Sequence, residues 1–327
     1  MRTTIQLACV LASCVALTVA GGAAQAGTYP EKPIRLIVPY VAGGAADITA
    51  RVMAAHMTKD LGATVVVENK PGANGMIGTD LVAKSAPDGY TLLLDASGPL
   101  VVNPSLYAKT PYDPVKDFAP ISQITSYQYV LVVPEASKIQ GLPDLIAAAK
   151  QAPGAVTYGS AGIGAGGHLA GELFAVQTGT QLSHIPYKGN AQALTDVLGG
   201  QLTFTFDTVV TATPHIRSGK LRGYAVSGPR RAPGLPDIPT LQELGYKDFE
   251  VTQFQGLLAP AGTDPAIIAR LHKAVQKAAH DPEVVFKLAT EGGNEMVAGT
   301  PEAFAVQIDE DLARYRKLIK DANVKAD

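Results

Sequence analysis

The sequence has only two cysteines and almost no excess of charge. Cys9 and Cys14 both lie in an N-terminal segment that has one basic residue, an apolar run over 5–20 and the small-x-small pattern at 24–26. This combination is typical of a secretory signal peptide. We expect cleavage after Ala26 and a periplasmic protein. The mature chain then has no thiol, disulfide or cysteine metal site, so its stability depends on core packing.

The same segment has a second interpretation. Leu11–Cys14 fits a bacterial lipoprotein box, which would anchor the chain through Cys14. Cutting there would leave a very short hydrophobic region and an apolar mature end, so we favour cleavage after Ala26. The apolar run is too short for a membrane span.

The near balance of charge excludes several classes of partner. The chain has 27 basic and 29 acidic residues, and loss of Arg2 leaves 26 against 29, a net charge of about −3. Such a balance argues against nucleic acid or a membrane surface as partner. Removing 26 of the 327 residues leaves 301, enough to bury roughly three quarters of the unfolded surface and to form two domains.

Strand-like runs alternate with helical patterns along the mature chain, which predicts an α/β protein with mostly parallel sheets and a helical tail. We expect strands at 34–38, 64–68, 90–94, 129–133, 155–158, 183–187, 202–206 and 221–226. We expect helices at 48–57, 76–85, 142–151, 166–178, 191–198, 210–218, 265–280, 282–290 and 301–322. Two α/β units suggest two lobes. No Gly/Ser linker separates them, so the chain should cross between lobes through extended strands.

A glycine loop follows the first strand. Gly43 and Gly44 can adopt positive φ and allow a ligand to approach the backbone, and Asp47 is the expected N-cap of a helix that starts at Ile48. The N–H groups of the first helical turn suit a carboxylate or another anion. The same arrangement recurs at 155–168. Either loop alone is equally consistent with an ordinary strand–helix turn that binds nothing.

A series of short motifs lies along the mature chain in a fixed order. They are Tyr29–Ile34, Val38–Asp47, Val67–Gly75, Asp88–Leu92, Asp117–Pro120, Tyr158–His168, His184–Gly189, Gly219–Arg222, Pro236–Gly245 and Ala259–Gly262. Together they resemble the Bug family, the periplasmic solute-binding receptors of tripartite tricarboxylate transporters. The resemblance extends to about residue 265 and identifies the family far better than it identifies the ligand.

The resemblance implies a type II periplasmic-binding-protein fold, in which two α/β lobes joined by two crossing strands enclose a cleft. It assigns 27–125 and 226–327 to lobe 1 and 126–225 to lobe 2, with the return crossing open between 221 and 258. In the family, backbone N–H groups and ordered water of two glycine loops hold the ligand carboxylate. The positions carried over are Tyr40, Ala42, Gly43, Gly44 and Asp47 on one wall and Ser160, Gly162, Gly164 and His168 on the other.

The chain departs from the family pattern at three places. Ala45 stands where the family often has another glycine, Phe254 stands where tryptophan is expected, and Gly262-Thr-Asp-Pro265 replaces Gly-Thr-Pro. The first departure stiffens one wall of the cleft. For His168, a packing or capping role is favoured over direct contact with the ligand.

Further candidates come from strand ends, where open α/β sheets place ligand residues. Asp207 follows the run 202–206 and would either accept hydrogen bonds from a ligand ammonium or hydroxyl group, or cap the helix after it. Asp95 poses the same choice, and Ser97 would supply a hydroxyl group to the cleft. Tyr187, together with Tyr40 and Tyr158, would offer apolar faces with polar tips.

Enzyme interpretations fail on missing residues. Gly162–Gly167 satisfies G-x-G-x-x-G, but no ribose-binding acid follows about twenty residues later. Tyr158 stands where a nucleophile elbow needs its first glycine. There is no H-E-x-x-H, and the six histidines show no metal-binding spacing. We therefore expect no catalytic residue, no cofactor and no metal.

The prediction is a monomeric receptor that captures a small organic carboxylate and delivers it to the membrane subunits of a transporter. Apart from Lys188, no lysine or arginine falls in a loop expected to face the cleft, so a mono- or dicarboxylate fits better than a tricarboxylate. The alternative is a sensing module whose loaded form binds a sensor ectodomain. The sequence does not separate the two.

Overall fold

The computed structural model describes residues 29–321 and 324–325. The expected signal peptide, with both cysteines, lies outside the described residues. The chain divides into two units, 1–31 and 32–327, and the architecture below is that of the second. Over the ranges that the structure describes, no helix is both long and apolar enough to cross a membrane.

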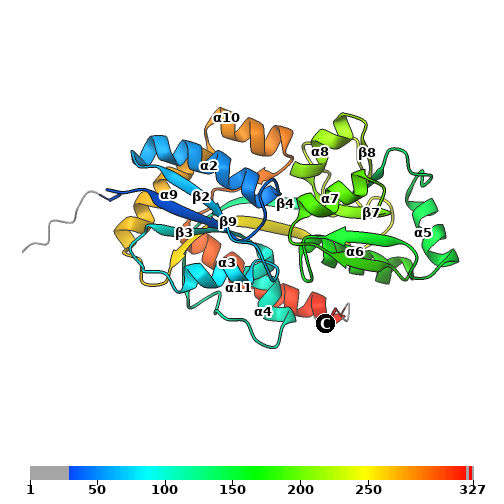
Figure 1. Cartoon of the computed structure of the whole chain (residues 1–327), viewed down its shortest axis with the longest axis horizontal. Helices are drawn as coiled ribbons and strands as arrows, with labels where there is room; N and C mark the ends of the chain where they lie inside the picture. The colour runs from blue at the N-terminus through cyan, green and yellow to red at the C-terminus, as the bar shows by residue number, and fades with distance from the viewer. Residues whose placement is uncertain (1–28, 322–323, 326–327) are drawn as a thin grey trace, which may run out of the picture. The chain divides into compact units, whose positions relative to one another are not determined.

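The first half of this unit is a parallel sheet with helical crossovers. Its strands are β1 (Ile34–Val38), β2 (Val65–Asn69) and β3 (Thr91–Ala96), and its crossover helices are α2 (Ala45–Leu61) and α3 (Met76–Ala83). β1 lies between β2 and β3 and pairs in parallel with both. All its residues except Arg35 are buried, as expected of a strand covered on both faces. Figure 1 shows α2 and α3 on opposite faces of the sheet.

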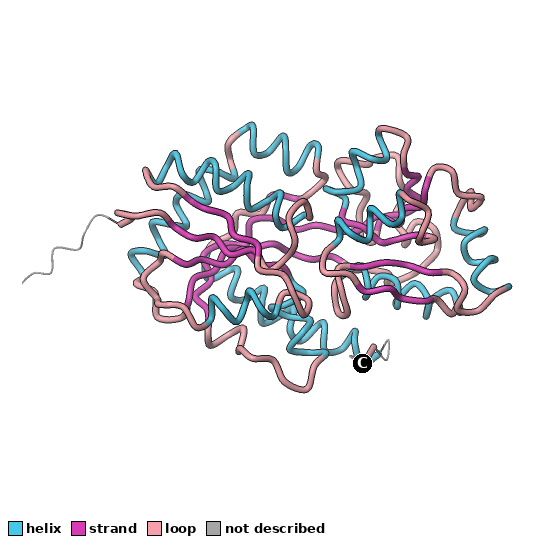
Figure 2. Tube along the Cα trace, in the orientation of Figure 1, coloured by secondary structure: helices cyan, strands magenta, loops and turns pink. Residues whose placement is uncertain are grey.

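The second half repeats this design. Its strands are β5 (Thr157–Ser160), β6 (Ser183–Pro186), β7 (Phe204–Thr208) and β8 (Leu221–Val226), and its helices are α5 (Leu142–Gln151), α6 (Gly166–Thr178), α7 (Asn190–Leu198) and α8 (Val209–Arg217). β5 lies between β6 and β7 and is parallel to both. Figure 2 shows helices on both faces of this sheet as well.

Two long strands connect the halves. They are β4 (Phe118–Pro134) and β9 (Thr252–Pro260). Residues 118–128 of β4 pair with β9 in the first sheet, and residues 129–134 pair with β7 and β8 in the second. β4 thus pairs in both sheets, as expected of an extended crossing strand, whereas β9 pairs only with β3 and β4 in the first sheet. In Figure 1 both strands run through the centre of this unit.

The helical tail packs on the first sheet. Its helices are α9 (Pro265–Ala279), α10 (Pro282–Val285) and α11 (Pro301–Asp321), each with proline at its start, as predicted. Asp264 and Asp281 cap the first two by accepting backbone N–H bonds. The second helix is shorter than predicted because it passes into a π-helical segment at Phe286–Glu291. The short strand β10 (Glu295–Met296) then pairs with β4.

Sequence reasoning missed several elements. The proline-rich segment 103–120 contains α4 (Asn103–Leu106), which follows a π-helical segment at Gly98–Val102, and the beginning of β4. β9 and β10 were not predicted, and β4 extends far beyond the expected 129–133.

The segment between β8 and β9 packs against the second sheet. Phe249 stacks on Phe206 of β7 with ring centroids 6.0 Å apart, and Tyr246 contacts Phe174 of α6 at 6.1 Å. The chain therefore leaves the second sheet at about residue 251 and enters the first sheet with β9.

Candidate functional site

The first glycine loop joins β1 to α2. Gly43 has φ of +83°, and its N–H donates to Oδ2 of Asp47 at 2.9 Å. Asp47 also accepts hydrogen bonds from Arg51 and Asn69. Burial opposes ionisation of Asp47, but these hydrogen bonds outweigh it and lower its pKa. The Asp47 carboxylate therefore holds the loop in place through its hydrogen bond with Gly43.

Two details of this loop differ from the sequence predictions. Asp47 is not the N-cap, because α2 begins at Ala45 and its N-cap is Gly44. Gly44 has φ of −83°, so the positive φ that we expected of both glycines occurs only at Gly43. Gly44 makes no side-chain cap, and the first N–H groups of α2 have no partner within the helix.

The second glycine loop joins β5 to α6. Ser160 Oγ donates to the carbonyl of Gly162 at 3.0 Å and accepts its N–H at 3.1 Å. The N–H of Gly164 donates to Nδ1 of His168 at 3.0 Å. His168 is buried and stacks on His184, so its geometry is that of a packing and capping residue. The N–H groups of Gly162 and Gly164 therefore form hydrogen bonds within their own loop. The N–H of Gly43 does the same in the first loop.

A cavity of about 40 Å³ lies between the two loops. Its walls are Tyr40, Val41, Gly44, Ala45, Ala46, Ala96, Tyr127, Tyr129, Ala161, Ala165, Gly166, Gly189, Asn190, Thr208, Gln253 and Gln255. The starts of α2 and α6 both belong to this wall, and neither helix has a side-chain cap. No lysine, arginine, histidine or carboxylate is among the lining residues.

The floor of the cavity is polar and comes from β4 and β9. Oε1 of Gln253 accepts hydrogen bonds from the hydroxyl groups of Tyr129 at 2.6 Å and Tyr127 at 3.1 Å. Burial raises the pKa of both tyrosines, so both remain protonated donors. Nε2 of Gln253 is buried and finds no partner in the described part of the chain. Oε1 of Gln255 accepts from Thr125 at 3.2 Å.

Of the twelve predicted ligand residues, Tyr40 and Gly44 line this cavity. Ala42 and Gly43 are exposed and lie outside its wall. Ser160, Gly162, Gly164 and His168 form the loop behind Ala161 and Ala165. Ser97 is buried, and its hydroxyl accepts the N–H of Phe254 at 2.9 Å. The two predicted loops thus both reach the cavity. Most of the loop residues that line it, such as Val41, Ala161 and Ala165, are neighbours of the predicted ones.

Asp207 lies one layer behind the cavity. It belongs to β7, where we expected it just after the strand, and its carboxylate accepts hydrogen bonds from Thr211 at 2.6 Å and Asn190 at 2.9 Å. The N-cap of α8 is Thr208, without a side-chain cap. Burial raises the pKa of Asp207 to about 6. Asp207 therefore orients Asn190, which does line the cavity.

The tyrosines proposed to face the ligand diverge. Tyr40 lines the cavity. Tyr187 is turned toward α7, and its hydroxyl donates to Asp196 at 2.5 Å. Tyr158 is fully buried in the core and donates to Glu172 at 2.6 Å, so the prediction that it offers a face to the cleft is wrong. Tyr127 and Tyr129, which sequence reasoning missed, take that position.

One group of potential metal ligands occurs within the described ranges. It is His56 on α2 with Asp281 and Glu283 at the start of α10. Nδ1 of His56 lies 3.3 Å from Asp281, and Nε2 lies 3.7 Å from Glu283. Each carboxylate thus faces a different ring nitrogen of His56. None of the three lines the cavity.

The family model described as "Tripartite tricarboxylate transporter family receptor" matches residues 49–324. The solved structure of the periplasmic binding protein BugD is 37% identical, with a TM-score of 0.87 over 91% of this chain and 99% of that one. Rpa4515 of R. palustris, solved with adipate, is 32% identical, with a TM-score of 0.87 over 91% and 99% of the two chains. MatC from Rhodopseudomonas palustris, with bound malate, is 29% identical, with a TM-score of 0.85 over 89% and 100%. The two-lobed type II periplasmic-binding-protein fold is confirmed.

Proposed function

The chain belongs to the receptor family of tripartite tricarboxylate transporters, and from this premise we propose that it binds a small dicarboxylate between its lobes in the periplasm. The observation that carries the proposal is that α2 and α6 both begin at one cavity. Helix N-termini present free N–H groups and partial positive charge, which stabilise an anion. Two such ends, one from each lobe, suit a ligand with a carboxylate at each end.

The absence of cations from the cavity wall supports a ligand of modest charge. No lysine or arginine lines the cavity, so N–H dipoles and hydroxyl groups must balance the carboxylates. The starts of α7 and α8 also reach this wall, so the choice of a dicarboxylate rests on the lack of cations and on the relatives. The relatives solved with malate and with adipate both hold dicarboxylates, in agreement with two anion positions.

The size of the cavity indicates that the lobes move. About 40 Å³ holds roughly three water molecules, which is less than a dicarboxylate needs. We propose that the lobes separate to admit the ligand and close over it. We divide the lobes by the sheets, with 129–251 as lobe 2 in place of the expected 126–225, the remaining mature chain as lobe 1, and β4 and β9 as the hinge strands. This arrangement serves capture and delivery to a membrane transporter and needs no catalytic group.

A thermal-shift and calorimetric titration tests the function. Protein refolded after removal of bound ligand should melt at a higher temperature with malate or adipate, because binding only the native state stabilises it. The uncharged diamide of adipate is the control and should have no effect. If no dicarboxylate stabilises the stripped protein, the proposal is wrong.

A matched pair of variants tests the role of α2. Ala45→Pro removes the first helical N–H, and proline is tolerated there because Gly44 before it is extended. Ala45→Ser keeps the N–H at similar size. We expect the proline variant to lose about 1.5–3 kcal/mol of binding free energy, the value of a hydrogen bond to a charged group. Equal affinity of the two variants would show that the first N–H of α2 does not bind the ligand.

A further inference from the structure

The two lobes touch beside the cavity at a contact between Val41 and Gly189. Val41 lies in the loop between β1 and α2, Gly189 precedes α7, and both line the cavity. A Cβ atom added at Gly189 would lie 2.5 Å from Cγ2 of Val41, and its three nearest heavy atoms all belong to that valine. Because Cβ atoms do not approach other carbons so closely, this contact leaves no room for a side chain at position 189.

Backbone conformation does not explain the glycine. Gly189 has φ of 172°, which is extended backbone that every residue adopts. Val41 has little freedom to move aside, because a β-branched side chain is restricted at χ1. Its Cβ and backbone nitrogen would also lie only 3.7 and 3.8 Å from the added atom. The space between the lobes is therefore what requires glycine here.

A second contact of the same kind lies at the other glycine loop. A Cβ atom at Gly164 would lie 2.8 Å from Cδ2 of Leu106 and 3.3 Å from Cγ1 of Val102, both in the first lobe. Gly164 has φ of +79°, so its backbone alone already favours glycine. Position 189 is the cleaner probe, since only the distance between the lobes acts there.

We propose that the Val41–Gly189 contact sets how closely the lobes approach and thereby sets the affinity for ligand. The proposal rests on the proposed function and describes the regulation of that same site. Apparent affinity scales with the fraction of molecules that reach the binding-competent arrangement. A side chain at position 189 would collide with Val41 when the lobes close, and would therefore lower this fraction. It leaves each lobe folded, because the atoms it meets belong to the opposite lobe.

The binding test uses Gly189→Ala, Val41→Ala and the double variant, with Gly141→Ala as control. Gly141 precedes α5 as Gly189 precedes α7, has an equally extended φ of −177°, and would place its Cβ 3.4 Å from Pro143 of its own helix. Calorimetry with adipate should show about a tenfold or larger rise in Kd for Gly189→Ala. The double variant should bind as Val41→Ala does, and Gly141→Ala as wild type does. A Gly189→Ala protein that binds as tightly as wild type overturns the proposal.

A distance measurement between the two lobes tests the role of the Val41–Gly189 contact even without a ligand. The chain expressed from residue 27 has no cysteine, so spin labels can be placed at Ile77→Cys on α3 and Val176→Cys on α6, which are 57% and 58% exposed. Gly189→Ala should deplete the closed component of the distance distribution, and adding Val41→Ala should restore it. Unchanged distributions, or no closed component in wild type, refute the contact. Failure of wild type to bind any dicarboxylate refutes the proposed function instead.

Discussion

At the scale of single residues, the Asp207 carboxyl group carries a cost that depends on pH. Its exposed fraction is 1%, and burial raises its pKa from 3.8 to about 6. Below pH 4 both the folded and the unfolded chain hold the proton. Between pH 4 and 6 the unfolded chain has released it while the folded chain keeps it, so raising the pH favours unfolding. Above pH 6 the folded protein bears the full cost of the buried charge.

Asp207→Asn should remove this dependence. We expect the free energy of unfolding of wild type, relative to the variant, to fall by on the order of 2–3 kcal/mol between pH 4 and 7. Urea denaturation of both proteins across this range measures it. Asp95, whose pKa burial raises to about 7, titrates in both proteins and cancels in the difference. Parallel pH profiles would show that Asp207 ionises normally in the folded state.

The position of the two adjacent glycines of the first loop could be predicted from the sequence, but their backbone conformations could not. The pair was correctly placed between strand and helix, because Gly-Gly after a buried apolar run has few other uses. Which glycine carries positive φ, and which faces the cavity, depends on the reach of the Asp47 side chain back to Gly43. Because α2 starts at Ala45, Asp47 lies in its first turn, where its carboxylate can accept the N–H of Gly43. With the helix start expected at Ile48, this hydrogen bond could not be predicted.

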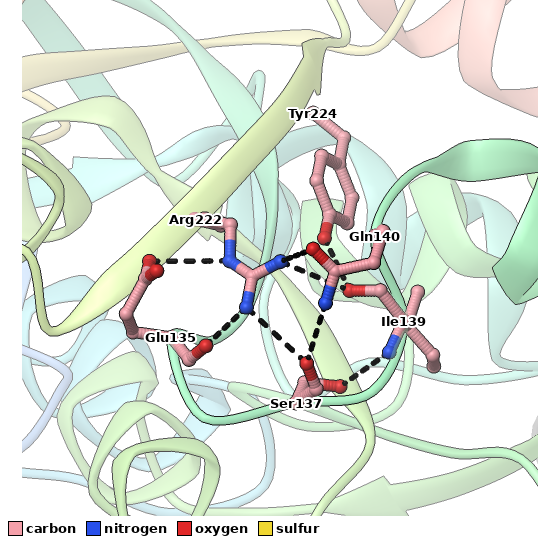
Figure 3. A network of polar contacts seen from close by, with 6 residues as sticks. All are labelled: Glu135, Ser137, Ile139, Gln140, Arg222 and Tyr224. Atoms are coloured by element: carbon pink, nitrogen blue, oxygen red, sulfur yellow. Dashed lines mark hydrogen bonds and ion pairs between the residues drawn. The ribbon is translucent and has the colours of Figure 1, made fainter.

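At the scale of elements, the loop between β4 and α5 is held by one arginine of β8. Figure 3 shows Arg222 at the centre of a network with Glu135, Ser137, Ile139 and Gln140. Its guanidinium donates to the Glu135 carboxylate at 3.1 Å, to Oε1 of Gln140 at 2.7 Å and to the Ser137 carbonyl at 3.2 Å. It also donates to the Glu135 carbonyl. Only a planar fork with several N–H groups can make these bonds together.

Arg222→Lys should therefore destabilise the protein although it keeps the charge. We expect a loss of roughly 1–3 kcal/mol in the free energy of unfolding, with faster hydrogen exchange confined to 135–141. Arg230→Lys is the control, because Arg230 makes a single ion pair with Glu295 at an exposed site where substitution costs about 1 kcal/mol or less. Equal losses for the two variants would mean that the network adds nothing beyond charge.

The hinge strands are the elements that local reasoning missed. β9 carries Gln253, Gln255 and Gly256 within an apolar run, and the first part of β4 contains Pro120 and several polar residues, so neither follows the usual strand pattern. Gln253 and Gln255 of β9 form the floor of the cavity together with Tyr127 and Tyr129 of β4. The strands that build the site are thus the ones whose sequence departs from the rule, as expected at a functional position.

At the scale of the whole molecule, the two lobes could be predicted because each strand–helix unit has its own periodic pattern. The cavity could be predicted only in part. Part of its wall comes from two local loops, but its floor joins Tyr127 to Gln253, which are 126 positions apart. No local pattern encodes such a pairing, which arises when β4 and β9 come together between the lobes.

The distribution of charge over the molecule gives a last prediction. No charged side chain lines the cavity, and the whole chain has a formal net charge of −2, so no positive field attracts the ligand from a distance. Buried N–H dipoles act at short range and are screened little by salt. We expect the Kd for adipate, measured by calorimetry, to change by less than about threefold between roughly 20 and 500 mM NaCl. A steep loss of affinity with salt would reveal a cation at the site and contradict recognition by helix N-termini.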